Sequence, residues 1–582
     1  MNRVFGLSFE IKAVQPAITE GGRLRDLVGA SELVDWLCRP DPKGDDLLAH
    51  VIAAVGVQDK LSFARRAGAA FRVFSDDRDA LLRLRALWTF VVESSLSGLE
   101  VVTAVVEGDS QAAVAEHLTR AGEAARAARP VLLPVVGPFV RRAPRTGRPA
   151  ERHDKVAREL VDRLTVQKRK VTDKEEEEAL DLQGLIRRFR PTAVEEGLMW
   201  PTTFEPEPGQ VVFPLPDNNT HVAVVHADGN GLGRILLELH KRLAAQALPP
   251  TGYADAFFAF SQAISTATVA AASEAVGRVL VPAAQQGQIV PARPILLGGD
   301  DLTIIVRGDL AIPFTACFLA SFARHTASAL KTLREGTGPL ATSLADMQLE
   351  RLTAGAGIAF IKASQPFHLG LDLADSLTEF AKRVAKSTPL QPVPSVLAFH
   401  RVTTTLVDSY GALLERELSF EEKGQRRRLS LQPYAIPTDG AAIGDLPSLV
   451  DLEALAEWLN PKGEEAGSRA GTLREIAGRW RDDPDEAQRR YRRWHRVTDE
   501  REKAKDEDKR AIREFEARMT KLHGATCGPG GPGFSQEREI GERRPLPPGT
   551  PIVDALAWLA ARAGGKQVPR VAEVIAPEAA NG

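Results

Sequence analysis

The chain has 582 residues, more than one hydrophobic core usually supports, so we expect several domains. Its 75 Lys and Arg residues nearly balance its 77 Asp and Glu residues, and this net charge of -2 excludes nucleic-acid binding through bulk positive charge. Three scattered cysteines, Cys38, Cys317 and Cys527, exclude a disulfide framework and a zinc ribbon. There is no signal-peptide pattern at the amino terminus and no run near the ~18 apolar residues of a membrane span, so we expect a cytoplasmic protein that does not bind a membrane.

Strand and helix patterns alternate over residues 1–150. The sequence predicts strands at Val4–Ile11, Ala69–Phe74 and Val101–Glu107, and helices at Ala13–Leu37 and Asp79–Ser94. This order is typical of an α+β domain.

Residues 151–215 predict a helical connector. The runs Lys168-Arg169-Lys170 and Asp173–Glu178 are dense in charge, which favours a solvent-facing surface. The dipeptide His153-Asp154 stands without the further histidines of a two-metal nuclease site, so we interpret it as surface.

Residues 216–410 repeat the alternation of the first unit. The predicted strands are Val222–Ala227, a hairpin around residues 295–305, Gly355–Ile361 and Val396–His400. The predicted helices are Leu232–Gln246, Ala254–Val276, Phe314–Leu333 and Leu371–Ala385. Two α+β units of similar organisation therefore share the chain.

Residues 411–582 are predicted to be mainly helical and charged, with a Gly- and Pro-rich break at 524–551 and a last helix at Ile552–Ala563. Arg489–Arg496 interleaves arginines with Tyr and Trp, and Arg426–Arg428 is a second basic run. Both runs are candidates for contacts with RNA. The acidic residues next to Arg489–Arg496 favour a solvated helix there instead.

Residues 295–305, Ile-Leu-Leu-Gly-Gly-Asp-Asp-Leu-Thr-Ile-Ile, predict a tight hairpin that presents two adjacent carboxylates. Gly298 and Gly299 permit the positive φ angles of a tight turn, and the flanking apolar, β-branched residues favour buried strands. The turn would place Asp300 and Asp301 at the rim of a sheet, where they attract a divalent cation.

A second motif, His-Ala-Asp-Gly-Asn-Gly-Leu-Gly at 226–233, follows a predicted strand. In a ferredoxin-like βαββαβ sheet the first strand lies beside the third, so Asp228 would converge with Asp300 and Asp301. Three carboxylates at one point can hold two Mg²⁺ ions roughly 3.5–4 Å apart. The geometry suits nucleotidyl transfer.

The glycines of the second motif favour a phosphate cradle. Gly229, Gly231 and Gly233 let the backbone approach a triphosphate, and the following helix supplies free N–H groups and the positive end of its dipole. Each motif alone is more often a simple turn, but the two in this order predict a metal and nucleotide site.

The paired motifs resemble those of the second palm domain of the large subunit of type III CRISPR effector complexes, the cyclic oligoadenylate synthetase. Residues 354–359, Ala-Gly-Ala-Gly-Ile-Ala, are similar to its late strand, and Ala381-Lys382 with Lys386 to its Ala-Lys helix. Val14-Gln15 and Arg23–Ser31 are similar to the family's first, noncatalytic palm. The resemblance covers about residues 1–405.

The resemblance implies an α+β fold with two ferredoxin-like palm (βαββαβ) domains. It assigns 1–150 to the noncatalytic palm, 151–215 to the helical connector, 216–410 to the palm with the Gly-Gly-Asp-Asp cyclase site, and 411–582 to a C-terminal helical domain.

The resemblance also implies site residues and ligands. Asp228, Asp300 and Asp301 would be catalytic and would bind Mg²⁺ or Mn²⁺, with ATP as the substrate. The residues implied to contact the nucleotide are Gly229, Asn230, Gly231, Gly233, Ser261, Gly298, Gly299, Lys382 and Lys386. The implied partners are the other subunits of a guide-RNA effector complex, with guide and target RNA bound indirectly or through the basic runs.

The sequence departs from the family pattern in two places, and its first unit also lacks a carboxylate hairpin. It begins with a palm-like strand where many members carry an HD nuclease domain, so we expect no nuclease activity. It lacks the cysteine pairs of the zinc module found in many relatives. In the first unit, residues 67–71 read Ala-Gly-Ala-Ala-Phe where a carboxylate hairpin would stand, so we expect no metal chemistry there.

The resemblance implies synthesis of cyclic oligoadenylate messengers from ATP in antiviral defence, activated by target RNA. Two other functions stay open: a catalytically silent scaffold subunit of the guide-RNA complex, and a stand-alone cyclase related to the GGDEF enzymes. All three carboxylates are present, which argues against the scaffold. Asp-Leu follows Gly-Gly-Asp where GGDEF enzymes carry Glu-Phe, which argues against the stand-alone cyclase.

Overall fold

The computed structural model describes most of the chain. The described residues are 3–38, 40, 46–96, 98–128, 137, 139–155, 158–177, 198–204, 211–216, 220–284, 289–402, 409–438, 442–460, 469–504, 511–523, 534, 538–540, 543–562 and 568–577. Cys527, most of the Gly- and Pro-rich segment at 524–551, and connector residues 178–197 lie outside them.

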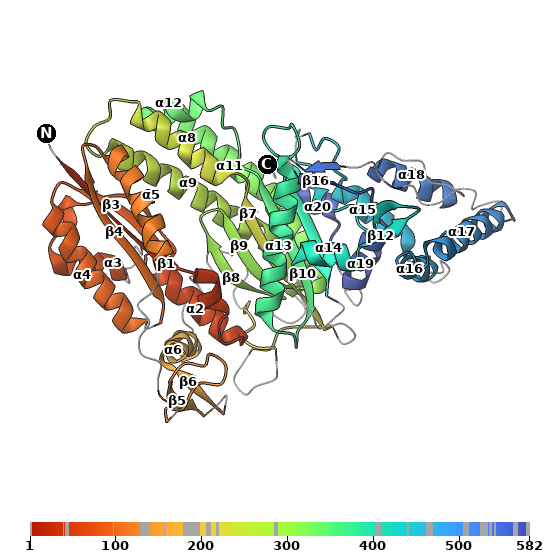
Figure 1. Cartoon of the computed structure of the whole chain (residues 1–582), viewed down its shortest axis with the longest axis horizontal. Coiled ribbons are helices and arrows are strands. Elements are labelled where there is room, and N and C mark those ends of the chain that lie inside the picture. Colours follow the sequence, from red (N-terminus) through yellow and green to blue (C-terminus); the bar gives the residue numbers. More distant parts are fainter. Residues whose placement is uncertain are drawn as a thin grey trace.

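The first unit is built on a four-stranded antiparallel sheet in the order β2-β3-β1-β4 (Figure 1). Its strands are β1 (Val4–Lys12), β2 (Ser62–Ala67), β3 (Ala70–Ser75) and β4 (Glu100–Gly108). Its helices are α1 (Val14–Thr19), α2 (Leu24–Trp36), α3 (Leu47–Val55), α4 (Arg78–Ser95) and α5 (Gln111–Ala127). Phe9 pairs with Phe71 across the sheet, and both rings pack against Trp88 in the core.

The prediction of one helix over Ala13–Leu37 is wrong, because α1 and α2 are separate helices. Gly21 and Gly22 between them have φ angles of 106° and 70°, which a right-handed helix cannot accommodate. The sequence reading also missed strand β2 and helices α3 and α5.

Residues 150–177 form a hairpin and a helix rather than a purely helical connector. β5 (Ala150–Asp154) pairs with β6 (Glu159–Asp162), and α6 (Arg163–Glu177) follows. The prediction that Lys168 and Arg169 face solvent is wrong, since their exposed fractions are 2% and 1%.

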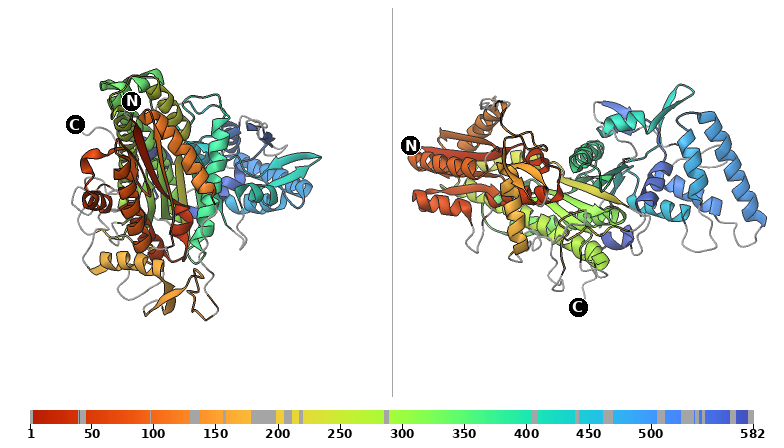
Figure 2. Two further views of the ribbon diagram at one scale, coloured as in Figure 1. Left: turned by 60° about the vertical axis from the view of Figure 1, so that its left-hand side comes forward. Right: turned by 90° about the horizontal axis from the view of Figure 1, so that it is seen from below.

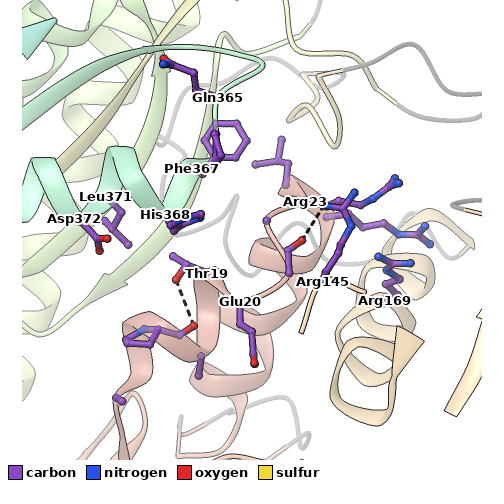
Figure 3. Close-up of a pocket in the computed structure, with 18 of the residues that line it drawn as sticks. Thr19, Glu20, Arg23, Arg145, Arg169, Gln365, Phe367, His368, Leu371 and Asp372 are labelled. Carbon is purple, nitrogen blue, oxygen red and sulfur yellow. Dashed lines mark hydrogen bonds between the residues drawn. The ribbon is translucent and has the colours of Figure 1, made fainter. Parts of the chain in front are cut away.

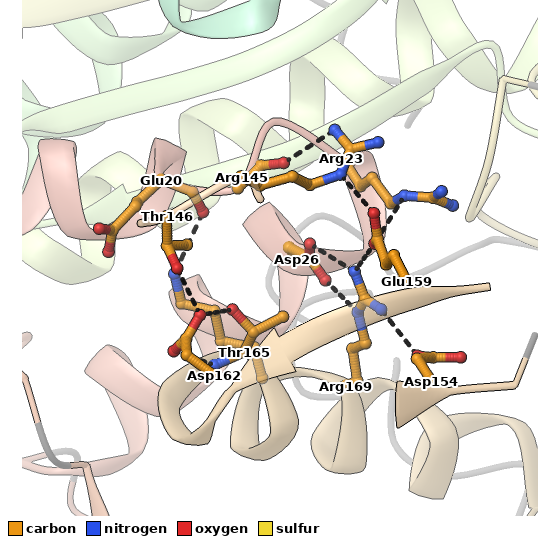
Figure 4. A network of polar contacts seen from close by, with 12 residues as sticks. Glu20, Arg23, Asp26, Arg145, Thr146, Asp154, Glu159, Asp162, Thr165 and Arg169 are labelled. Carbon is orange, nitrogen blue, oxygen red and sulfur yellow. Dashed lines mark hydrogen bonds and ion pairs between the residues drawn. The ribbon is translucent and has the colours of Figure 1, made fainter. Parts of the chain in front are cut away.

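Arg169 lies at the centre of a buried ion cluster (Figure 4). Its guanidinium donates to both carboxylate oxygens of Asp26 on α2, at 2.7 and 3.0 Å, and to Asp154 and Glu159 at 2.7 and 2.8 Å. A planar guanidinium matches a carboxylate in this two-bond arrangement. The cluster ties the connector to the first unit.

The second unit contains a six-stranded sheet in the order β14-β11-β10-β7-β9-β8. Its strands are β7 (His221–Gly229), β8 (Ala292–Gly298), β9 (Asp301–Arg307), β10 (Ala354–Lys362), β11 (Val396–Arg401) and β14 (Tyr434–Ala435). The strands β8-β9-β7-β10 repeat the order β2-β3-β1-β4 of the first unit. The predicted mixed α+β class is confirmed.

Helices cover both faces of the second sheet. They are α8 (Leu232–Ala244), α9 (Gly252–Ala275), α10 (Val281–Ala284), α11 (Ala311–Glu335), α12 (Pro339–Asp346) and α13 (Phe367–Lys386). α13 packs on β10 and β7 from one side, whereas α9 and α11 pack together on the other (Figure 2). This explains why nearly all of β7 is buried.

One helical stretch, Gly252–Ala284, is long and apolar enough by length and composition to cross a membrane, although the sequence reading found no such run. It comprises α9, a π-helical turn at Val276–Leu280 and α10. Half of its most apolar 18-residue stretch is buried inside the protein, where α9 packs against α11 and against β2 of the first unit.

The C-terminal part is mainly helical but also contains strands that the sequence reading missed. Its helices are α14 (Tyr410–Arg416), α15 (Leu449–Leu459), α16 (Ala470–Arg479), α17 (Pro484–Ala504), α18 (Ala511–His523), α19 (Ile552–Arg562) and α20 (Val571–Ile575). The two small hairpins pair β12 (Ser419–Glu422) with β13 (Gln425–Arg428) and β15 (Arg538–Ile540) with β16 (Arg543–Leu546).

The two basic runs in this part do not form open surfaces for stacking on RNA bases. Tyr491 and His495 of α17 are buried in the core, so the aromatic residues of that run face inward. Arg428 is buried and donates to the carbonyl of Pro547, and Arg427 donates to Glu422. The arginines at 489, 492, 493 and 496 are exposed on α17, together with Asp485 and Glu500, as expected for a solvated helix.

Replacing Arg169 by Ala should destabilise the first unit strongly. The fully buried Asp26 would lose its guanidinium partner, and we expect the free energy of unfolding to fall by about 3–5 kcal/mol in urea denaturation. Lys170→Ala, at the exposed next position, should stay within about 0.5 kcal/mol of the wild type. Equal losses for the two variants would contradict a structural role of the cluster.

The stability of the second unit should fall on mild acidification because of His400. Burial lowers the pKa of this imidazole to about 4, below the 6.5 of an exposed histidine. The stabilisation from neutral His400 is therefore complete above pH 6.5 and is lost as the pH falls toward 4.

Between pH 7.5 and 5.5 we expect the wild type to lose about 1 kcal/mol more unfolding free energy than His400→Gln. His50→Gln, at an exposed position, should follow the wild type. A loss of the same size in His400→Gln would show that another group causes the pH dependence.

Candidate functional site

Three carboxylates from two neighbouring strands meet at one edge of the second sheet. Asp228 lies at the end of β7, Asp301 begins β9, and Asp300 occupies the turn between β8 and β9. β7 and β9 pair antiparallel with Ala227 opposite Leu302, which brings these residues together. One oxygen of each carboxylate lies within 4.8 Å of the other two. The strand order predicted from the sequence thus produces the expected acidic cluster.

Backbone glycines make room for the cluster. Gly299 has a φ of 62°, and its carbonyl accepts a hydrogen bond from Thr268 of α9 at 2.7 Å. A side chain at Gly229 would place its Cβ only 2.3 Å from Asp300 Oδ2. Glycine at 229 therefore allows Asp300 to lie against β7.

The electrostatics of the cluster favour a bound cation. Burial and the charge of Asp228 raise the pKa of Asp300, and burial and the charge of Asp300 raise the pKa of Asp301. Burial opposes ionisation of Asp228 too, but hydrogen bonds from Asp301 and Lys382 hold its pKa below the usual range. The carboxylates repel one another, and a divalent cation would relieve that repulsion.

Lys382 of α13 reaches into the cluster. Its ammonium pairs with Asp228 and donates to the carbonyl of Gly229 at 2.8 Å. β10 carries glycines beneath α13: a Cβ at Gly355 would lie 2.4 Å from Lys382 Cγ, and one at Gly357 would lie 2.0 Å from the carbonyl of Ala374. These glycines let α13 lie close enough for Lys382 to touch Asp228.

His226 borders the cluster, and the sequence reading missed it. It lies two residues before Asp228, on the same face of β7, and only 4% of it is exposed. Its Nδ1 is 3.0 Å from Thr303 Oγ1, and its Nε2 is 3.5 Å from Asp375 Oδ1. Burial lowers the pKa of this imidazole. Its position two residues before Asp228 on a predicted strand was the sequence feature that could have placed it beside the cluster.

Asn230 and Gly231 shape the loop between β7 and α8. The Asn230 amide donates to Thr353 Oγ1 at 3.0 Å and to the carbonyl of Pro394 at 3.4 Å, which anchors the loop to the residue before β10. Gly231, with a φ of 72°, is the N-cap of α8. Gly233 lies in the first turn of α8, and the space where its Cβ would stand is open.

Two predicted nucleotide contacts lie farther from the carboxylates. Ser261 is half-buried on α9, seven residues before Thr268 and so about 10 Å away along the helix. Among the described interactions, none joins Ser261 to the acidic cluster. Lys386 lies one turn beyond Lys382 on α13, with its side chain exposed.

A cavity of about 1060 Å³ lies between the two units (Figure 3). Arginines from the first unit and the connector, among them Arg23 and Arg145, line one side, and Phe367 and His368 at the start of α13 line the other. Asp375, which contacts His226, also lines it. The cavity therefore extends along α13 toward the acidic cluster. The sequence reading did not predict it, because its walls come from three separate segments.

Comparison with known proteins gives similarity only at the level of structure. No protein-family profile matches the chain, and no curated protein matches its sequence. Csm1 of T. onnurineus is 12% identical, with a TM-score of 0.46 and coverage of 97% of this chain and 70% of that chain. A Csm1-Csm4 cassette in complex with cA4 is 13% identical, with a TM-score of 0.41, and the match covers 86% of this chain and 65% of the solved chain.

A Csm1-Csm4 subcomplex of the type III-A CRISPR-Csm interference complex is 12% identical, with a TM-score of 0.42 and coverage of 85% and 65%. The chain thus spans about two thirds of the length of the solved chains that it matches.

Proposed function

We propose that the second unit is a palm-type nucleotidyltransferase that makes cyclic oligoadenylate from ATP. The observation that carries the proposal is the acidic cluster of Asp228, Asp300 and Asp301, held at adjacent strand ends beside a lysine and a glycine loop. The first unit has the same strand order but carries Gly68 at its hairpin tip, and we assign it a noncatalytic palm role.

The three carboxylates are a fitting ligand set for Mg²⁺ or Mn²⁺, because they offer hard oxygen donors whose mutual repulsion a cation relieves. A divalent cation held there would favour ionisation of a ribose hydroxyl and offset charge on departing pyrophosphate. The carboxylates of Asp228, Asp300 and Asp301 would hold and orient the metal. Lys382, and Lys386 one helical turn away, supply positive charge toward the phosphates of the nucleotide.

In the proposed reaction a 3′-hydroxyl oxygen bonds to the α-phosphorus of a second ATP, the bond to pyrophosphate breaks, and the hydroxyl proton passes to solvent. Repetition lengthens the chain. The terminal 3′-hydroxyl then attacks the α-phosphorus of the 5′-triphosphate, which closes the ring, breaks the bond to the last pyrophosphate and releases a proton to solvent. The protein contributes positioning and preorganised charge. The cavity along α13 offers an arginine-lined side for phosphates and an aromatic side for a base.

We further propose that the chain works in the cytoplasm as the large subunit of a type III effector complex, with other subunits and guide and target RNA as partners. Solved Csm1-Csm4 cassettes are described in complex with cA4, pppApA and AMPPNP. We extend such ligands to this chain because of the acidic cluster and the motifs, not because of the overall structural match. A silent scaffold would not need three converging carboxylates.

Replacing Asp300 and Asp301 together by Asn should abolish product formation. Without the metal-binding charge we expect at least a ~10³-fold loss of adenylate rings, detected by mass spectrometry after incubation of ATP with the guide complex and target RNA. The exposed Asp346→Asn variant should retain wild-type output. Unchanged product from the double variant would refute the site, and a guanylate product would favour the stand-alone cyclase.

The metal site should also be visible in thermal stability. Mn²⁺ at a concentration of about 100 times its Kd should raise the free energy of unfolding of the wild type by about 2–3 kcal/mol, which would appear as a rise in Tm. Asp301→Asn should lose the response to Mn²⁺, because the amide replaces a carboxylate ligand that carries charge once the metal is bound. A full Mn²⁺ response in Asp301→Asn would place the metal elsewhere.

A further inference from the structure

The ammonium of Lys382 occupies a cation's position inside the acidic cluster. Its two partners are a carboxylate oxygen of Asp228 and the backbone carbonyl of Gly229. Carboxylate and carbonyl oxygens are also the ligand types that Mg²⁺ and Mn²⁺ take in proteins. The lysine and a metal ion would therefore compete for the carboxylate of Asp228.

The fold holds Lys382 in this position. Its side chain is 13% exposed, and its stem lies directly over Gly355, where any Cβ would collide with it. β10, which carries Gly355, pairs with β7 so that Gly355 lies opposite Asp228. The contact is therefore a consequence of strand register and helix packing, unlike the exposed Arg383 beside it.

We propose that Lys382 acts as a built-in counter-cation that competes with a divalent ion for Asp228 in the nucleotide-free protein. It neutralises part of the cluster while no metal is bound, and it leaves Asp228 when a metal binds there. The released ammonium would then be available to a phosphate group of the nucleotide. This inference rests on the proposed function, because it takes the acidic cluster to be the metal site.

The competition predicts how metal binding responds to loss of one positive charge. Lys382→Met keeps most of the stem but removes the charge, so Mn²⁺ should bind the full chain more tightly by on the order of tenfold or more without nucleotide. The electron paramagnetic resonance signal of free Mn²⁺ measures this affinity. Lys382→Arg, which keeps the charge, should not tighten binding.

Two control variants separate the possible outcomes. Arg383→Met removes an exposed charge from the next position of the same helix and should leave Mn²⁺ affinity unchanged. Asp301→Asn added to each variant should remove the site, which shows that the measured Mn²⁺ sits in the cluster. Melting curves of each variant verify that it folds.

If Lys382→Met binds Mn²⁺ with wild-type or weaker affinity at a site that Asp301→Asn removes, the counter-cation proposal is wrong while the metal site stands. If no Mn²⁺ site in the wild type depends on Asp301, the proposed function fails as well.

Discussion

The pairing of β7 with β9 is the constraint on which the candidate site depends. It brings Asp228 beside Asp300 and Asp301, although more than seventy residues separate them in the sequence. The surrounding structure adapts to this concentration of negative charge. Gly229 makes room for Asp300, Thr268 holds the turn at Gly299, and α13 lies close enough to β10 for Lys382 to neutralise Asp228. A partly buried carboxylate cluster costs free energy, and its presence here is better explained by function than by stability.

The two units share one strand order but differ at the corresponding hairpin. The β2-β3 hairpin of the first unit turns at Gly68 and bears no carboxylate at 67–71, whereas the β8-β9 hairpin bears two. The first unit instead supplies arginine-bearing walls to the cavity, and the buried cluster around Arg169 fixes those walls relative to α2 (Figure 4). In the proposed function, one palm carries the chemistry and the other helps to hold the nucleotides.

Local sequence patterns predicted the elements that carry the chemistry, because turn glycines and β-branched runs act over a few residues. The hairpin at 298–301 and the order of strands around Asp228 are examples. Contacts between distant residues were missed. Arg169 looked like part of a solvated charge run, since its partner Asp26 lies 143 residues away. Lys382 was assigned to phosphates by resemblance, but only the packing of α13 on β10 shows its contact with Asp228.

The most direct test of the central claim is anomalous diffraction from crystals of the protein soaked with Mn²⁺ and a non-hydrolysable ATP analogue. We predict anomalous peaks within coordination distance of carboxylate oxygens of Asp228, Asp300 and Asp301, with the triphosphate beside them and the ammonium of Lys382 no longer on Asp228. Nucleotide bound elsewhere, with no anomalous peak at the three carboxylates and Lys382 still paired with Asp228, would contradict it.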